Sequence, residues 1–389
     1  MKKLILAGAG HAHARALRDL AHAPIAGLEV MLISPDALAP YSGMVPGWLA
    51  GHYRWRESCI DFAALCNAAG TILQTGSIVA LDADAHELTL DNGHIIRYDW
   101  LSLNIGSTLF PTATDASTIL PMRPLGLLQQ RWDSLLESVR LLPPGREFHV
   151  AMVGGGAAGV ETILSADHRL RQVAPQVDFS FSLLTRSAAI LDGLPSAAIA
   201  AIQQQIAARK IRIIGNFAAA HVAGNIVHGE DGRTLQADVF LWATGAQALG
   251  WPARSGLATD GGGFVRVDAS LRSLSHRNIF AVGDCARFEP AVPKAGVFAV
   301  RMGPVQSCNL RAAVAGEPMR RYVPQRRYLM IMGTGDTHAV ASWGPFGWQG
   351  AWVWRLKQAI DRRFIASYGG HPQENRTAGG IRKPPLGLD

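Results

Sequence analysis

Cysteine is scarce in this sequence of 389 residues, and charged residues make up only 17% of it. The four cysteines stand singly, without a CxxC pair, at Cys59, Cys66, Cys285 and Cys308. Neither a disulfide framework nor a metal site is therefore expected, and a reducing cytoplasm is the expected setting. No run reaches about 18 uncharged apolar residues, so the sequence predicts no transmembrane helix.

The charge is unbalanced toward the basic side, with a formal net charge of +7. Such a charge suits an anionic ligand, an acidic membrane surface or nucleic acid. A nucleic-acid-binding protein would be expected to interleave basic and aromatic residues, and the sequence has no such motif. We therefore expect no nucleic-acid partner.

Two parts of the sequence repeat one pattern. LILAGAGHAHARAL at 4–17 and VAMVGGGAAGVETI at 150–163 each run from an apolar stretch through glycines to a helix-compatible segment. DNGHIIRYDWLSLNIGS at 91–107 then aligns without a gap on EDGRTLQADVFLWATGA at 230–246, at a constant offset of 139 residues. We interpret the repeat as a duplicated nucleotide-binding domain.

The glycine turns predict where phosphates bind. Glycines let the backbone approach a pyrophosphate, and the N-terminus of the following helix supplies N–H groups and a positive dipole. The second turn completes the pattern GxGxxG with Gly154, Gly156 and Gly159. The first keeps Gly8 and Gly10 but has His13 in third place, so its helix should lie slightly farther from the strand or bend. We expect His13 to serve local packing or a phosphate contact.

One segment breaks the symmetry of the repeat. NIFAVGDCARF at 278–288 has no counterpart after the first half, and it places Asp284 after Gly283 at the end of an apolar strand. A carboxylate there can accept hydrogen bonds from sugar-alcohol hydroxyls. At these residues, and at Ile105-Gly106-Ser107 and Ala243-Thr244-Gly245, the chain resembles flavoproteins with two dinucleotide-binding domains, the pyridine nucleotide-disulfide oxidoreductase superfamily. In that superfamily such a Gly-Asp holds the ribityl chain of FAD.

Within the superfamily the sequence most resembles type II NADH dehydrogenases. PYSGMVPGWLAGHY at 40–53 and PKAGVFAVRMGP at 293–304 also resemble the oxidoreductase module that some bacteria fuse to selenide, water dikinase. The resemblance implies an α/β fold with two Rossmann-like domains, the second inserted into the first, plus a C-terminal strand-and-helix appendage. The expected boundaries are 1–120 and 253–320 for an FAD-binding domain, 121–252 for an NAD(P)H-binding domain, and 321–389 for the appendage.

The resemblance also implies an activity, in which hydride passes from NAD(P)H to FAD and then to an acceptor. Glu161 resembles the superfamily glutamate that reaches toward nicotinamide and flavin, although a solvated helix carboxylate is the alternative. Lys294 precedes an expected helix and could stabilise the anionic reduced flavin, unless it is an ordinary surface lysine. The remaining residues expected at the FAD are Gly8, Gly10, Gly106, Ser107, Gly283, Asp284 and Ala295. Those expected at the nicotinamide nucleotide are Gly154, Gly156, Gly159, Thr244 and Gly245.

The second strand of each domain bears on nucleotide choice, because its end usually carries an acid for the ribose hydroxyls. EVMLISPD in the first half offers Ser34 and Asp36. SFSLLTRS in the second half offers Thr185 and Arg186, without an acid. An arginine can pair with a 2′-phosphate, which favours NADPH, although a surface arginine is the alternative.

The electron acceptor is less defined. PYSGMVPG at 40–47 occupies the place where disulfide reductases carry a redox-active cysteine pair, yet it contains no cysteine. Type II NADH dehydrogenases carry glutamines near the quinone that are missing from 295–301. A quinone, a flavin, oxygen and another small molecule all stay open as acceptors. The alternative function is a flavin-containing redox sensor or partner protein with little turnover.

The C-terminal part predicts strands over Tyr322 to Trp343 and a basic, amphipathic helix over Gly350 to Tyr368. Trp352, Leu356, Ile360 and Phe364 fall on one face of that helix, and charged residues fall elsewhere. The apolar face could lie on the inner surface of the cytoplasmic membrane, as the resemblance supports. It could equally dock on the protein body or on a second subunit of a homodimer.

Overall fold

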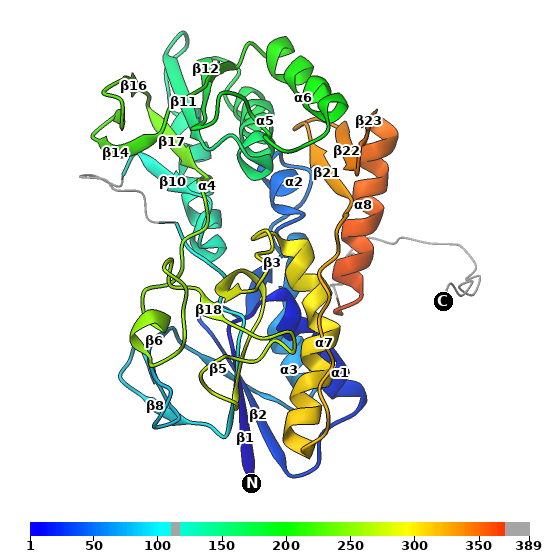
Figure 1. The fold of residues 1–389 in the computed structure, drawn as a ribbon. Coiled ribbons are helices and arrows are strands. Elements are labelled where there is room, and N and C mark those ends of the chain that lie inside the picture. Colours follow the sequence, from blue (N-terminus) through cyan, green and yellow to red (C-terminus); the bar gives the residue numbers. More distant parts are fainter. Residues whose placement is uncertain (110–116, 370–389) are drawn as a thin grey trace.

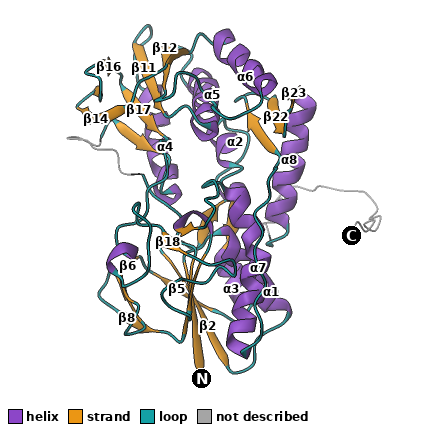
Figure 2. Ribbon diagram, viewed as in Figure 1, coloured by secondary structure: helices purple, strands orange, loops and turns teal. Residues whose placement is uncertain are grey.

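The chain folds into two α/β lobes and a C-terminal module that lies alongside both, as Figure 1 shows. This computed structural model describes residues 1–109 and 117–369, so residues 370–389 of the predicted appendage lie outside it. Figure 2 shows strands packed beside helices in each lobe. The α/β fold class predicted from the sequence is therefore confirmed.

The first lobe is built on a parallel sheet with β1 at its centre. The strand order is β19 (Ile279–Ala281), β9 (Trp100–Leu103), β1 (Lys2–Ala7), β2 (Leu28–Ser34) and β5 (Ile72–Thr75). The central strands are apolar runs because both faces of the sheet are covered, one mainly by helices and the other by a small antiparallel sheet. Those helices are α1 (His11–His22), α3 (Phe62–Ala68) and α7 (Gly296–Ala315). β19 comes from far along the chain and leads directly into Gly283-Asp284. The sheet of the first lobe is therefore complete only when this late segment has joined it.

The second lobe repeats this arrangement. Its parallel sheet has the order β10 (Ile119–Pro121), β17 (Val239–Trp242), β11 (Glu147–Val153), β12 (Asp178–Leu184) and β13 (Arg212–Ile214). The helices of this lobe are α4 (Leu128–Arg140), α5 (Ala157–Val173) and α6 (Ser196–Ala208). β10 pairs with β17, so this sheet already begins at Ile119, just before the predicted boundary at residue 121.

The repeat seen in the sequence reappears in the details of the two lobes. Each central sheet carries a three-stranded antiparallel sheet: β6 (Ile78–Asp82), β7 (Glu87–Leu90) and β8 (Ile95–Arg97) in the first lobe, and β14 (Ala219–Ala223), β15 (Ile226–Gly229) and β16 (Thr234–Gln236) in the second. Asp99 accepts the Lys3 N–H at 2.6 Å, and its counterpart Asp238 accepts the His149 N–H at 2.7 Å. A carboxylate thus ties the returning strand to the central one in both lobes.

Short elements connect the main strands and helices. The strands among them are β3 (Leu38–Pro40), β4 (Cys59–Asp61), β18 (Val265–Arg266) and β20 (Ala286–Arg287). The helical turns are α2 (Val45–Leu49), η1 (Arg56–Ser58), η2 (Leu125–Leu127), η3 (Pro252–Arg254) and η4 (Gly283–Cys285). α2 packs against α5, so the first lobe contacts the second directly.

The C-terminal module is an antiparallel sheet followed by one helix, as the sequence predicts. It consists of β21 (Met330–Gly333), β22 (Ala339–Trp343), β23 (Phe346–Gly350) and α8 (Ala351–Ala366). Among the described residues, no helix is both long and apolar enough to cross a membrane. The inner face of α8 buries two charged side chains, Lys357 and Asp361, which a sequence pattern would normally place in solvent.

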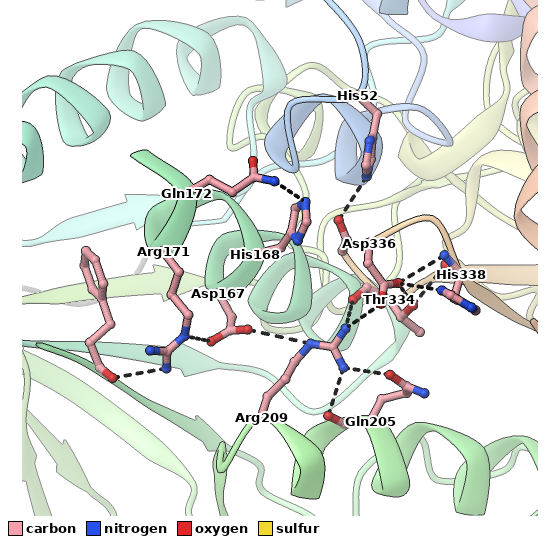
Figure 3. A network of polar contacts seen from close by, with 12 residues as sticks. His52, Asp167, His168, Arg171, Gln172, Gln205, Arg209, Thr334, Asp336 and His338 are labelled. Carbon is pink, nitrogen blue, oxygen red and sulfur yellow. Dashed lines mark hydrogen bonds and ion pairs between the residues drawn. The ribbon is translucent and has the colours of Figure 1, made fainter. Parts of the chain in front are cut away.

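Arg209, the C-cap of α6, fixes the module to the second lobe, at the centre of the network in Figure 3. Its guanidinium donates to the Thr334 carbonyl at 3.0 Å and to Asp336 at 3.1 Å. It also lies 3.6 Å from the buried carboxylate of Asp167 in α5. One side chain therefore joins α5, α6 and the loop after β21.

We expect Arg209→Met to loosen the module. The substitution removes charge-assisted hydrogen bonds to partly buried partners, which predicts a loss of about 2 kcal/mol in the free energy of unfolding. It also predicts faster hydrogen exchange in β21, β22 and α8. Arg233→Met is the matched control, because Arg233 pairs with Asp231 on the surface, where both side chains are 46% exposed. Equal exchange rates in the two variants would contradict the role of Arg209.

Candidate functional site

The first glycine turn passes close to the strand that returns beside it. Gly8 has φ +97°, and a Cβ there would lie 2.6 Å from the carbonyl oxygen of Asn104, at the end of β9. A Cβ on Gly10 would lie 2.1 Å from Asn104 Oδ1. Only glycine fits at either position, and the predicted strand, turn and helix are all present.

Asn104 is a residue of this site that the sequence reasoning missed. It is buried, and its Oδ1 accepts N–H groups of Ala12 and His13 at 3.1 and 3.4 Å. Its Nδ2 donates to the Val282 carbonyl at 3.0 Å. The side chain therefore joins the start of α1, the end of β9 and the Gly283-Asp284 segment. The available signal was a polar residue at the place where the repeat has Ala243.

His13 takes the space that a third glycine would leave open. The ring is fully buried, with Nδ1 2.7 Å from the Gly8 carbonyl and Nε2 2.7 Å from Ser102 Oγ. Burial lowers the pKa of His13 to about 4, so the imidazole is neutral at physiological pH. The structure thus shows the packing role, whereas a phosphate contact stays a prediction.

Asp284 lies at the end of the first sheet, as predicted, and it has a partner that the sequence did not indicate. Arg123, in the segment that enters the second lobe, donates to its carboxylate at 2.6 Å. Ser107 donates to the same oxygen at 3.3 Å. The carboxylate is therefore oriented from both lobes, and its side chain remains 14% exposed.

The second glycine turn matches the first. A Cβ on Gly154 would lie 2.3 Å from the Ala243 carbonyl oxygen, and one on Gly159 would lie 1.9 Å from the Gly154 carbonyl oxygen. These two glycines permit close backbone packing. A Cβ on Gly156 or Gly245 would instead meet no protein atom within 4 Å, so these glycines face free space. In the first lobe Gly106 is open in the same way.

A pocket of about 350 Å³ opens beside the second turn. It is lined by the turn itself, by the end of β12, by the loop before α6 and by two residues that precede or begin β21. The lining residues are Gly155, Gly156, Ala157, Thr185, Ser187, Ala189, Leu191, Asp192, Gly193, Leu194, Tyr328 and Met330. Arg186 is exposed and is not among them. Thr244 is also exposed, and its hydroxyl accepts the indole N–H of Trp242.

Glu161 lies on α5 one turn after the second glycine turn and points toward the C-terminal module. Its Oε1 accepts the Gly333 N–H at 2.8 Å. Burial raises the pKa of Glu161 to about 7, against the opposing effects of the Lys357 charge and the Gly333 hydrogen bond. This carboxyl can therefore hold or release a proton near neutral pH.

Lys357 and Asp361 of α8 form a buried ion pair near Glu161. Lys357 Nζ lies 2.9 Å from Asp361 and donates to the Gly43 carbonyl at 2.5 Å. The Tyr41 hydroxyl hydrogen-bonds to Asp361, and burial raises the tyrosine pKa. The sequence did not indicate this cluster, because Tyr41, Gly43 and Glu161 are far from α8 in the chain and the buried face of α8 was not known.

The segment PYSGMVPG, where disulfide reductases carry cysteines, lies against the start of α7. A Cβ on Gly296 would lie 2.7 Å from Ser42 Oγ. Tyr41 stacks on Phe364 of α8 at a centroid distance of 4.3 Å and lies edge-on to His11 at 5.4 Å. Aromatic contacts thus connect this segment to α1 and α8.

Three predicted residues have local partners or lie in solvent. Lys294 Nζ donates to the Ala286 carbonyl and lies 3.9 Å from the centroid of the Phe264 ring. Ala295 is the N-cap of α7. Asp36 is exposed, beside Gly126 of the segment that joins the lobes. Contacts of these residues with a cofactor stay predictions.

Two linked dinucleotide-binding lobes with matched glycine turns define a flavoprotein class. A family model described as pyridine nucleotide-disulphide oxidoreductase matches residues 2–303, and the chain belongs to this family. Peroxisomal monodehydroascorbate reductase 1 of Arabidopsis thaliana is 26% identical over 74% of this chain and 68% of its own length.

Solved structures share the fold. Sulfide:quinone oxidoreductase of Aquifex aeolicus has a TM-score of 0.78 at 18% identity, covering 96% of this chain and 93% of that one. NDH2 from Plasmodium falciparum, in complex with NADH, has a TM-score of 0.75 at 13% identity, covering 95% and 99%. The chain is an FAD-dependent NAD(P)H oxidoreductase, as the sequence predicts.

The residues present fit the two nucleotides. Gly106, Gly156 and Gly245 leave space that a Cβ would fill, at the strand ends and helix start where nucleotides bind in this fold. Asp284 offers carboxylate oxygens for ribityl hydroxyls.

We expect Asp284→Ala to lower FAD retention at least tenfold, because it removes the carboxylate that would accept the ribityl hydrogen bonds. The measurement is the ratio of flavin to protein absorbance after gel filtration. Asp231→Ala is the control, since Asp231 also pairs with an arginine at 2.6 Å but lies in the small sheet of the second lobe. A full flavin content in a folded Asp284→Ala protein would remove Asp284 from the site.

Proposed function

We propose that this enzyme passes hydride equivalents from NAD(P)H through FAD to a small acceptor of the quinone class. The observation that carries the proposal is the duplicated pair of glycine turns, with the titratable Glu161 between the second turn and the C-terminal module. Names of relatives support a quinone: the structural neighbour from Aquifex aeolicus is a sulfide:quinone oxidoreductase.

The residues divide into three tasks. In the first lobe, Gly8, Gly10 and Gly106 would admit FAD, with Ser107, Gly283, Asp284 and Ala295 along it. In the second lobe, Gly154, Gly156, Gly159 and Gly245 would admit the nicotinamide nucleotide, with Thr244 and Arg186 toward its ends. FAD, when bound, accepts and donates hydride, and the protein holds the two ring systems in contact. His13, Asp36 and Lys294 complete the proposed set.

Glu161 would donate the proton that the acceptor takes up when it is reduced. A quinone that takes up a hydride also takes up a proton, and a carboxyl with a pKa of about 7 can donate one near neutral pH. Lys357 and Asp361 lie close enough to influence that pKa. The buried pair therefore belongs to the electrostatic surroundings of the proposed site.

The test of the function is anaerobic stopped-flow spectroscopy of the purified flavoprotein. Mixing with NADH or NADPH should bleach the flavin rapidly, and a water-soluble quinone should then restore its colour. Rapid bleaching without reoxidation by any acceptor would instead favour the rival function, a flavin-containing redox sensor with little turnover. An absence of bleaching would contradict both the hydride path and the assignment of the second lobe.

The pKa of Glu161 generates a prediction on pH. Reoxidation of reduced flavin by the quinone should slow as pH rises through about 7, because the proton donor is lost. Glu161→Gln should lack this step, whereas Glu137→Gln, at an exposed helix position, should keep it. The folded protein holds this proton more tightly than the unfolded chain, so Glu161 also lowers stability as pH rises from 4.5 toward 7. A step retained in Glu161→Gln would contradict the role.

We also propose that an anionic membrane covers the outer face of the C-terminal module. An outer apolar patch there consists of Trp343, Phe346, Trp348, Trp352, Leu356 and Ile360, each at least 40% exposed. Exposed arginines flank the patch at Arg355, Arg362 and Arg363 of α8, and Arg327 lies beside the turn at Gly344. Apolar rings with basic residues around them are typical of a surface that enters a lipid interface.

We expect a triple substitution of Trp352, Leu356 and Ile360 by serine to weaken binding to phosphatidylglycerol vesicles at least tenfold in a sedimentation assay. The reason is the lost burial of apolar surface. Leu141→Ser is the control, because Leu141 is 85% exposed on the second lobe. Binding equal to that of the unchanged protein would contradict the proposal. A dimer that the triple substitution dissociates would assign the patch to a second copy instead.

A further inference from the structure

The pocket beside the second glycine turn has an acid in its wall. Among the described residues that line it, Asp192 is the one charged side chain. Thr185 and Ser187 contribute hydroxyls, whereas Arg186 between them is exposed outside the lining. The polar groups of the pocket are thus hydroxyls and a carboxylate, which suit a ligand that presents hydroxyl groups.

The loop that carries Asp192 is held against the glycine turn. The Leu191 N–H donates to the Gly155 carbonyl at 2.8 Å, and the Leu194 N–H donates back to the Leu191 carbonyl at 3.1 Å. Gly193 has φ +85°, so residues 191–194 form a tight turn with Asp192 at its second position. Asp192 is an exposed residue that lines the pocket, and the residue before it, Leu191, is hydrogen-bonded to the glycine turn.

Leu191 anchors that turn in a conformation that L-residues rarely adopt. Its φ is +57°, and its side chain is buried. A buried leucine keeps this left-handed backbone conformation only where the surrounding structure imposes it. The close contact of Gly155 with Thr185 adds a second constraint, because a Cβ on Gly155 would lie 2.5 Å from Thr185 Oγ1. The glycine turn, the end of β12 and the Asp192 turn form one rigid wall.

The position of the pocket identifies the part of the nucleotide that enters it. In this fold the pyrophosphate lies at the helix start, here Ala157, and the adenosine ribose lies at the end of the second strand, here Thr185. Asp192 faces the same pocket. We infer that Asp192 accepts hydrogen bonds from the adenosine ribose hydroxyls, and that the enzyme selects NADH over NADPH. This inference rests on the proposed function.

The charge of Asp192 explains the selectivity. With NADH the carboxylate accepts hydrogen bonds from two hydroxyls, whereas the 2′-phosphate of NADPH removes one hydroxyl and places like charges together. The sequence pattern favoured NADPH because Arg186 follows the strand directly. An acid supplied six residues after Arg186 takes the role that the strand end lacks.

The experiment measures dissociation constants of NADH and NADPH and the rates at which each reduces the flavin anaerobically. The unchanged enzyme should prefer NADH at least tenfold. Asp192→Asn should weaken the binding of NADH about tenfold, because it removes a charged hydrogen-bond acceptor. The ratio of the NADPH and NADH dissociation constants should then be near one. Asp192→Glu should restore part of the preference, and Arg233→Met, at a surface position of the second lobe, should leave it unchanged.

Two results would overturn the inference: a preference for NADPH in the unchanged enzyme, or a ratio of NADH to NADPH affinity that Asp192→Asn does not alter. Unfolding midpoints confirm that each variant is folded, and Asp192→Ser provides a second removal of the carboxylate. If neither nucleotide reduces the flavin, the proposed function fails. The ratio of dissociation constants then still decides whether Asp192 selects the ribose.

Discussion

The close passage of two backbones at each glycine turn is the constraint on which the rest of the structure depends. Gly8 lies under the Asn104 carbonyl, and Gly154 lies under the Ala243 carbonyl, with no room for a Cβ. This packing forces the chain to turn from strand to helix at the edge of the sheet where the neighbouring parallel strand, β9 or β17, also ends. The start of the helix and the ends of the strands therefore converge at one point in each lobe.

The two copies of this arrangement have diverged in what stabilises the turn. In the second lobe Gly159 lets the helix approach the Gly154 carbonyl. In the first lobe the His13 ring bonds to the Gly8 carbonyl, and Asn104 binds the first N–H groups of the helix. Side chains thus stabilise the first turn, whereas direct backbone packing stabilises the second. The strand orders of the two sheets nevertheless match.

Sequence alone could predict the parts of this molecule that depend on local patterns. The repeat at offset 139, the strand ending at Asp284 and the C-terminal helix are all present, because apolar periodicity and glycine spacing determine them. Arg123, Asn104 and the Lys357–Asp361 pair could not be predicted, since each acts across more than 90 residues or depends on which face of a helix is buried. Arg186 illustrates a further limit: its place directly after a strand suggests a nucleotide contact, which stays a prediction, and the sequence pattern did not indicate that Asp192 of the following loop lines the pocket.

The discontinuous first lobe has a consequence for how the chain is made. Its sheet needs β19, which ends at Ala281, whereas the sheet of the second lobe spans only Ile119 to Trp242. On a ribosome the inserted lobe is therefore complete while the lobe that begins the chain still lacks an edge strand and Asp284. Domains generally fold as units during synthesis, at about 5 to 20 residues per second. The nascent N-terminal strands must then wait several seconds, with one edge unpaired, before flavin can be captured.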